Sequence, residues 1–204
     1  MAGRQLTSFE HILLGLICLA PSSGYDLKRM FAATPMGVYQ PSSGALYPAL
    51  RRLEQQDLIQ AQAVVGQGAA SARRRRVYAP TAAGRTAHVS WLRTPIEPAT
   101  VGRDLGLHLM RFVMMERLLP VEEVLGFLQS LADTMAAFTA QLEQYAAATS
   151  ANDAPASHSD RHPRLALEHG LAVHRASLRW AQDTIAALST EPAPATATAE
   201  VMEG

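Results

Sequence analysis

The sequence predicts a mostly α-helical protein that contains one small β-hairpin. Apolar residues recur three and four positions apart through most of the 204 residues, which is the period of an amphipathic helix. Residues 59–66 and 73–81 instead have the composition of extended strands, and the turn-rich segment between them suits the tip of a hairpin. Helices are therefore expected before and after a short hairpin in the sequence.

Charge divides the chain into two halves. Residues 1–95 hold 11 Lys and Arg against 4 Asp and Glu, a net charge of +7. Residues 96–204 hold 7 against 14, a net charge of −7. A basic half predicts a polyanionic partner for the N-terminal region. Chance drift in composition is the alternative, but the basic excess is concentrated in one run of arginines.

Two helices are predicted before residue 34. Thr7 and Glu10 form the capping-box pattern that opens the first, because a hydroxyl is followed by a carboxylate three positions later. The segment APSSG, residues 20–24, ends this helix. A second helix is expected over about residues 24–33, and a loop follows it.

The third helix lies within SSGALYPALRRLEQQDLI, residues 42–59. Leu46, Leu50 and Leu53 form its apolar stripe, at the spacing that places side chains on one helix face. Pro48 removes one backbone donor, but about one turn into the helix this is expected to cost little.

A fourth helix follows the hairpin. Thr81 is expected to cap it, and it runs over roughly residues 82–93. The segment TPIEPATVGRD, residues 94–104, has the composition of a linker. The N-terminal domain is therefore expected to cover residues 1–95.

The C-terminal region is predicted to be helical over residues 96–188, with a disordered Pro/Ala/Thr-rich tail over 189–204. One helix reaches Pro120, and two further helices carry apolar residues at alternating spacings of four and three, which is a heptad seam. Such seams predict an antiparallel hairpin or a dimer interface, and an intramolecular helical pair is the alternative. The residues expected in dimerisation are Val124, Leu128, Leu131, Met135, Phe138, Leu171 and Leu178.

Three helices followed by a hairpin form the layout of a winged helix-turn-helix domain, whose third helix enters the major groove of DNA. Ser42 and Ser43 can cap that helix or donate to phosphate, and Gly44 allows close approach of the backbone. Tyr47 and Arg51 share the face that lies away from the leucine stripe. A solvated face would also explain Arg51, but its position beside an anion-binding helix start favours DNA contact.

The run of arginines lies on the second strand of the expected hairpin. Because successive side chains of a strand alternate between its faces, Arg73, Arg74, Arg75 and Arg76 can place two guanidinium groups toward a duplex. Charge on a strand also protects a sheet edge, which is the alternative. DNA contact is the preferred interpretation.

Three segments resemble the PadR-like family of winged-helix transcriptional regulators. They are SGYDLK at the second helix, LYPALRRLE in the third, and a Y-x-x-T-x-x-G pattern after the wing. The resemblance is strong over about residues 10–93, and beyond that it rests on layout. It implies a homodimeric regulator of transcription, usually a repressor, and two-fold symmetry then predicts an inverted-repeat operator in double-stranded DNA. The single cysteine and an N-terminus without a secretion-signal pattern predict a cytoplasmic protein. Tyr25 and Lys28, with Ser43, Gly44 and Tyr47, fall on positions that the family uses for DNA contact, although Tyr25 equally suits packing.

The resemblance also implies a small aromatic or lipophilic effector. Trp91 is late in the fourth helix, and Met114 could line an apolar pocket. Arg111 and His174 could pair with a carboxylate on such a ligand. Ordinary core packing with satisfied polar groups is the preferred interpretation of the same four residues.

Other function classes find little support. No Gly-rich phosphate loop, Gly-x-Ser-x-Gly or His-Glu-x-x-His pattern is present, so no enzyme and no cofactor is expected. The single cysteine excludes a cysteine-rich metal cluster, and no metal site is predicted. No apolar run is long enough for a membrane span. The competing function is a protein-interaction module that acts through its C-terminal helices.

Overall fold

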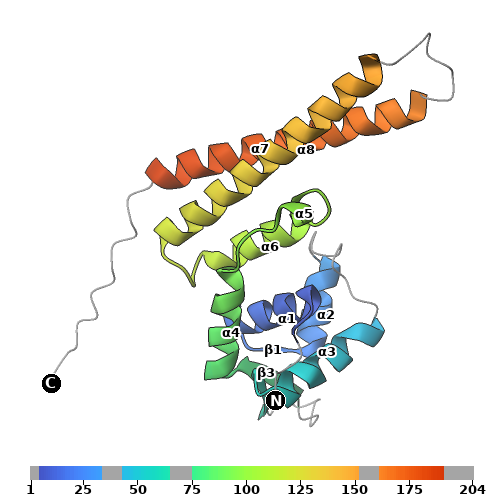
Figure 1. The fold of residues 1–204 in the computed structure, drawn as a ribbon. Coiled ribbons are helices and arrows are strands. Elements are labelled where there is room, and N and C mark those ends of the chain that lie inside the picture. Colours follow the sequence, from blue (N-terminus) through green and yellow to red (C-terminus); the bar gives the residue numbers. More distant parts are fainter. Residues whose placement is uncertain (1–4, 34–42, 65–74, 152–160, 191–204) are drawn as a thin grey trace. The chain divides into compact units, whose positions relative to one another are not determined.

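The structure of the protein is a computed structural model that describes residues 5–33, 43–64, 75–151 and 161–190. The chain forms two compact units (Figure 1). The N-terminal unit comprises Met1–Pro95 and Leu109–Leu118, and the C-terminal unit comprises Ile96–His108 and Leu119–Gly204. The prediction of a mostly helical chain with a small antiparallel sheet is confirmed.

The N-terminal unit contains the predicted three helices, hairpin and fourth helix. In chain order its elements are α1 (Ser8–Leu19), β1 (Ser22–Ser23), α2 (Gly24–Ala33), α3 (Ser43–Gln55), β2 (Ile59–Val64), β3 (Arg75–Pro80) and α4 (Ala82–Leu92). The sheet has three strands in the order β1-β3-β2, and both pairings are antiparallel. Strand β1 was missed, because its two residues pair with the distant Tyr78 and Val77 and carry no strand pattern of their own.

Local capping residues set where the helices of this unit begin. Thr7 and Glu10 make the predicted capping box, with the Thr7 amide donating to the Glu10 carboxylate over 2.8 Å. A similar arrangement opens α2, where the Ser23 hydroxyl accepts from the Asp26 amide over 3.2 Å. The predicted cap at Thr81 is confirmed, since its hydroxyl accepts from the amide of Gly84 over 2.9 Å.

The core of the unit lies between α1, α2, α3 and α4. The leucine stripe of α3 is buried as predicted, and Leu27 and Phe31 of α2 are buried with it. Pro48 lies deeper than expected, in the second turn of α3. Because proline has no N–H, the carbonyl of Gly44 loses its intrahelical donor there. The cost is therefore one helical hydrogen bond, which the buried leucines on either side offset.

The Y-x-x-T-x-x-G pattern has a structural explanation. Tyr78 is buried in the core, and the Thr81 hydroxyl donates to the carbonyl of Asp57 over 2.6 Å while its amide donates to the carbonyl of Leu58 over 3.1 Å. A Cβ atom on Gly84 would overlap that same Leu58 carbonyl. The pattern thus fastens the start of α4 to the turn that follows α3.

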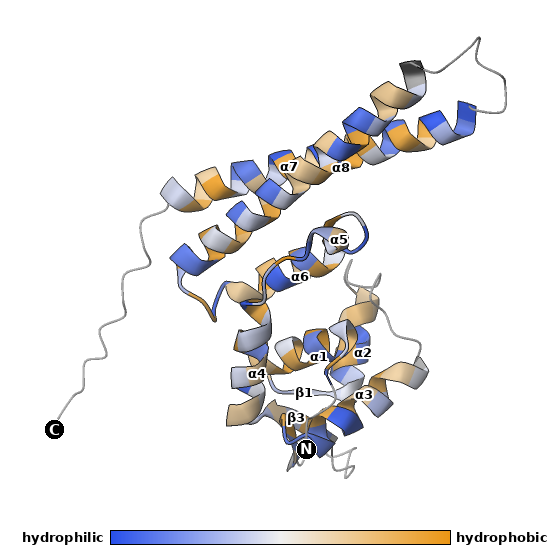
Figure 2. Ribbon diagram, viewed as in Figure 1, coloured by the Kyte–Doolittle hydropathy of each residue, from blue (hydrophilic) through white to orange (hydrophobic). Residues whose placement is uncertain are grey.

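The C-terminal unit is built from α5 (Pro98–Val101), the start of α6 (Leu105–Met115), α7 (Val121–Ala151) and α8 (Arg161–Thr190). Helices α7 and α8 pack along each other, and apolar residues recur along both, drawn orange in Figure 2. The expected linker over 94–104 is wrong in part, because it contains α5, and Val101 there is buried against α7. Residues 189 and 190 of the expected tail belong to α8, and residues 191–204 lie outside the described part of the chain.

The residues expected in dimerisation line the interior of this unit. Leu131 and Met135 form a buried cluster with Ile96 and Val101, and Leu178 packs against it. Leu128 is also fully buried. Val124 and Leu171 are buried, while Phe138 is partly exposed. Within the single chain these seam positions therefore make intramolecular contacts.

Candidate nucleic-acid interface

One exposed face of α3 carries the residues predicted to meet DNA. Tyr47 is 47% exposed, and Gly44 and Arg51 are also exposed, while the leucine stripe on the neighbouring face is buried. Tyr47 and Arg51 are one helical turn apart, so their side chains are neighbours on this face. The predicted division of α3 into a packed face and a solvent face is thus present.

The start of α2 adds to this exposed surface. Tyr25 is 64% exposed and Lys28 is exposed as well. The preceding residue, Gly24, is buried beneath the ring of Tyr47, and a Cβ atom there would lie 2.8 Å from Tyr47 Cε1. Gly24 therefore sets how closely Tyr47 of α3 packs on α2, which sequence reasoning missed.

Arg52, next to Arg51, has a different role. Its Nε donates to the Glu10 carboxylate over 2.5 Å, and the Glu10 side chain is only 3% exposed. Burial raises the pKa of Glu10, but hydrogen bonds from Thr7 and Arg52 outweigh it and leave the pKa below its ordinary value. This ion pair joins α1 to α3.

The last arginine of the run also has an internal partner. Arg76 Nη2 lies 2.6 and 2.7 Å from the two carboxylate oxygens of Glu54 on α3, and its guanidinium lies 5.5 Å from the centre of the Tyr78 ring. The Arg76 side chain is nevertheless 59% exposed. Ser42, Arg73 and Arg74 lie outside the described residues, and Ser43 and Arg75 are described by their backbone alone.

Glu54 is a member of this surface that sequence reasoning missed. It follows Tyr47 by seven positions and Arg51 by three, so it lies on the same face of α3. A signal was present in its spacing, but an acidic residue was not expected on a face meant for a polyanion.

Three of the four residues expected to bind an effector belong to the N-terminal unit. Arg111 is buried and lies 5.7 Å from the centre of the Trp91 ring. Its Nη2 donates to the carbonyl of Leu92 over 2.8 Å and to the carbonyl of Thr94. Met114 is fully buried, and its sulfur packs over Gly15 of α1.

Two histidines that the sequence did not single out complete this cluster. His11 stacks on Trp91, with the ring centres 4.7 Å apart and the planes 5° from parallel. His88 is fully buried beside it, and neither of its ring nitrogens has a hydrogen-bond partner in the described residues. Burial lowers the pKa of both histidines to about 4, and Arg111 adds to the effect on His11. Both are therefore neutral at pH 7.

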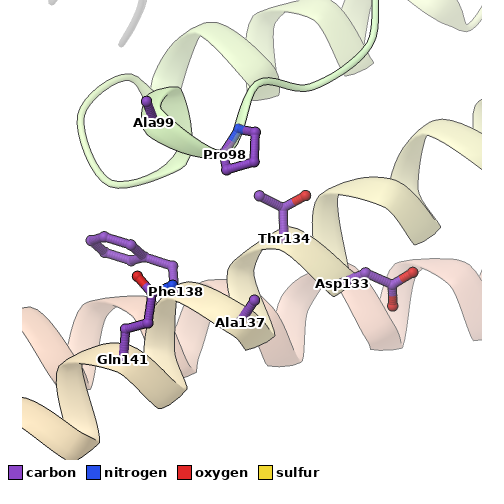
Figure 3. A pocket seen from close by; sticks show the side chains of 7 residues that line it. All are labelled: Pro98, Ala99, Asp133, Thr134, Ala137, Phe138 and Gln141. Carbon is purple, nitrogen blue, oxygen red and sulfur yellow. The ribbon is translucent and has the colours of Figure 1, made fainter.

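His174 belongs to the C-terminal unit, where its ring meets Phe138 edge-on at 4.8 Å. Burial lowers its pKa. Phe138 also lines a cavity of about 480 Å³ between α5 and α7 (Figure 3). Its walls are Pro98, Ala99, Asp133, Thr134, Ala137, Phe138 and Gln141. The four expected effector residues are thus divided between the two units.

None of the described helices is long and apolar enough to cross a membrane. Within the same residues, no group of three His, Cys, Asp or Glu side chains is placed to hold a metal ion.

Several known proteins are similar to the chain. The Probable transcriptional regulator Rv1176c of Mycobacterium tuberculosis (strain ATCC 25618 / H37Rv) is 28% identical over 100 residues, which are 49% of this chain and 51% of that protein. The match thus spans about half the length of this curated relative. Bacillus subtilis PadR, solved in complex with operator DNA, is 21% identical over 90% of this chain and 99% of its own, with a TM-score of 0.42. The Vibrio cholerae virulence activator AphA is 25% identical over 89% and 98%, with a TM-score of 0.37.

Two family models match separate parts of the chain. Residues 13–89, which hold α1 to most of α4, match the model described as Transcriptional regulator PadR-like family. Residues 111–189 match the model described as Virulence activator alpha C-term. The exposed face of α3, the wing and the Y-x-x-T-x-x-G pattern all fall within the first match. With these matches beside that geometry, residues 13–89 of the chain are similar to the PadR-like family of transcriptional regulators.

Proposed function

We propose that the protein is a homodimeric transcriptional repressor that binds an inverted-repeat operator with α3 in the major groove. The observation that carries this proposal is the exposure of Tyr25 and Lys28 on α2 together with that of Gly44, Tyr47 and Arg51 on α3. It belongs to a half of the chain with a net charge of +7. The match of residues 13–89 to the PadR-like family of transcriptional regulators supports the same function.

The chemistry of this surface suits DNA. The N-terminal end of a helix such as α3 carries the positive end of the helix dipole, which favours phosphate. Gly44 lets the backbone approach closely, and Arg51 can donate to a base edge or to phosphate. Arg73 to Arg76 would contact the neighbouring backbone from the wing, together with Ser42 and Ser43 at the start of α3.

The C-terminal unit would join two protomers. Tyr145, Leu165 and Val173 are large apolar residues that α7 and α8 leave exposed. A second copy could cover them by extending the seam that runs through Leu128, Leu131 and Met135 within one chain. Two-fold symmetry would then place the two α3 helices on half-sites about one helical turn of DNA apart.

A small aromatic or lipophilic effector would release the DNA. Trp91 and Met114 offer aromatic and thioether surface, and Arg111 lies beside them with a guanidinium partly engaged by backbone carbonyls. His174 offers a ring in the C-terminal unit. Binding would be measured by quenching of tryptophan fluorescence with a panel of phenolic acids and lipophilic cations, and by loss of the signal change in Trp91→Phe. A panel that neither quenches nor releases DNA would remove the effector from the proposal.

The proposed role is regulatory rather than enzymatic, and the proposed location is the cytoplasm, where the operator would be. A protein-interaction module acting through α7 and α8 would have the same fold without specific DNA binding. Selection of bound sequences from a random DNA pool separates the two. We expect an inverted repeat from the wild-type protein.

Two arginine variants refine the selection. Arg51→Ala should weaken binding to the selected site by about 1–3 kcal/mol, because it removes a group from the exposed face of α3. Arg179→Ala, an equally exposed arginine on α8, is the matched control and should bind as the wild type does. If no sequence is enriched from the pool, the proposed function as a DNA-binding regulator is rejected in favour of the protein-interaction module. Light scattering tests the dimer, and a monomeric mass at micromolar concentration would exclude it.

A further inference from the structure

Glu54 presents an electrostatic contradiction on the proposed DNA-binding face. Tyr47, Arg51 and Glu54 follow one another at four and three positions along α3, so they form one stripe. The first two are exposed and the third is partly exposed. A carboxylate at the end of such a stripe would repel phosphate unless another group neutralises it.

Arg76 of the wing is that group. Its Nη2 atom bridges both oxygens of the Glu54 carboxylate, at 2.6 and 2.7 Å. In the described part of the chain the carboxylate engages Nη2 alone. The guanidinium also carries Nη1 and Nε, and the side chain is 59% exposed. Arg76 therefore has hydrogen-bond donors left for a further acceptor.

Arg76 has two further structural supports besides Glu54, namely the Tyr78 ring and the strand β3 itself. Arg76 and Tyr78 are two apart on β3, so they lie on the same face of the sheet. The Tyr78 ring is buried, and the guanidinium lies 5.5 Å from its centre. β3 is the central strand of the sheet; at Arg76 it pairs with Ala63 of β2, and its pairing with β1 begins at the next residue, Val77. The Glu54 carboxylate and the Tyr78 ring together fix one guanidinium between the wing and α3.

We infer that Glu54 is a positioning residue for DNA binding, which holds Arg76 so that its free donors meet a phosphate next to the groove that α3 enters. This inference rests on the proposed function. A flexible arginine loses conformational freedom when it binds, and a fixed one has already lost it. The acidic residue thus favours binding to a polyanion although its own charge opposes it.

The test compares Glu54→Gln, Arg76→Gln and the double variant on the operator that the wild-type protein selects from a random pool. Dissociation constants are measured over a range of KCl concentrations. We expect Glu54→Gln to weaken binding about five-fold, although it removes a negative charge; this is about 1 kcal/mol. Arg76→Gln should reduce the salt slope by about 0.9, the value for one lost phosphate contact. The double variant should bind no worse than Arg76→Gln, because Glu54 acts through Arg76.

A second exposed pair supplies the control. Glu143 and Arg175 of the C-terminal unit approach to 2.6 Å with similar exposure, so Glu143→Gln removes the same kind of contact away from the proposed interface. It should leave binding unchanged. Thermal unfolding checks that each variant is folded, as expected for exposed ion pairs worth about 0–1 kcal/mol.

Three outcomes would overturn the inference while the proposed function stands. They are equal or tighter binding by Glu54→Gln, an unchanged salt slope in Arg76→Gln, and additive losses in the double variant. In each of these cases the wild type still selects an operator and Arg51→Ala still weakens binding. A wild-type protein that selects no DNA sequence would instead reject the proposed function itself.

Discussion

The contacts that stabilise the N-terminal unit internally differ in kind from those that stabilise the C-terminal unit. In the N-terminal unit, short-range bonds fix the ends of helices, and close backbone contacts leave little room, as at Gly84 against Leu58. In the C-terminal unit, the long helices α7 and α8 instead pack along an apolar seam. The first unit therefore depends on specific bonds and close contacts, whereas the second depends on side-chain packing between long helices.

Glycines make this difference measurable. Gly15, Gly24 and Gly84 of the N-terminal unit each lie against a neighbouring side chain or backbone atom that a methyl group would meet within 3 Å. In the C-terminal unit a methyl group on Gly102 would meet the Phe138 ring at 2.5 Å, whereas Gly126 and Gly170, on α7 and α8, have no such atom within 4 Å. The same substitution, glycine to alanine, is therefore expected to destabilise the protein at the tight positions and to stabilise it at the open positions of α7 and α8.

The largest effect is expected at Gly84. Helix propensity alone would make Gly84→Ala stabilising, but the added methyl group overlaps the Leu58 carbonyl, and neither backbone can easily move. We expect the free energy of unfolding to fall by about 3 kcal/mol. Urea denaturation followed by circular dichroism measures it, and an unchanged midpoint would mean that the turn and α4 are less tightly joined than their hydrogen bonds indicate.

The second-largest effect is expected when the pH is lowered, because the N-terminal unit contains two histidines with lowered pKa values. His11 and His88 bind protons in the unfolded chain near pH 6.5 but in the folded N-terminal unit only near pH 4. The unfolded state therefore holds more protons between these values, so stability falls as the pH drops from 6.5 to 4. For His88 the loss is on the order of 2–3 kcal/mol. Below the ordinary pKa of a glutamate, protonation of Glu10 removes further stability, because its folded-state pKa is lowered.

The measurement is the unfolding free energy at several pH values from 4 to 7, for the wild type and for His88→Leu. The variant lacks one of the two buried imidazoles, so its stability should vary less with pH. Equal slopes for both proteins would show that His88 is not responsible for the acid sensitivity.

A smaller effect is expected on DNA affinity at Gly24. The methyl group of Gly24→Ala would meet the Tyr47 ring, a side chain that can move, so the fold should survive while Tyr47 shifts on the face of α3. We expect about ten-fold weaker operator binding, equivalent to about 1.4 kcal/mol. Tyr47→Phe, which keeps the ring but removes the hydroxyl, shows whether ring position or hydrogen bonding matters. If Gly24→Ala binds the operator with wild-type affinity, the position of the Tyr47 ring does not matter for DNA recognition.

The smallest expected effect, and the opposite sign, belongs to the C-terminal unit. Gly126→Ala places a methyl group in open space on α7, so no steric clash opposes the gain in helix propensity. We expect stabilisation by about 0.5–1 kcal/mol, measured by urea denaturation. Destabilisation would mean that α7 is covered at Gly126 by a neighbour, which a second protomer would provide.

The difference between the units also explains what could be predicted from the sequence. The capping box at Thr7 and the cap at Thr81 are local patterns, and they were predicted correctly because their partners lie three residues away. The Arg52–Glu10 and Arg76–Glu54 pairs join residues 42 and 22 positions apart, and no spacing rule indicates them. β1 and α5 were missed for a related reason, since tertiary contacts rather than composition define them.

The exposed half of the site was accessible to sequence reasoning because it depends on one helix. Tyr47 and Arg51 follow from the period of α3 alone. The role of Gly24 became visible only once α2 was placed against that helix, and the partner of Glu54 only once Arg76 was placed beside it. His88 could not have been found from its sequence, because its burial depends on α1 and α6 meeting α4 over Gly15.

The bonds of Thr81 have a consequence for local unfolding. Its amide and hydroxyl hold the carbonyls of Leu58 and Asp57, and its hydroxyl also accepts from Gly84 at the start of α4. The end of β3, the turn after α3 and the first turn of α4 therefore share one set of bonds, and we expect them to open as a single cooperative unit. In hydrogen exchange, the amides of Thr81 and Gly84 should exchange with the same opening free energy. Different values would show that the end of β3 and the start of α4 open independently.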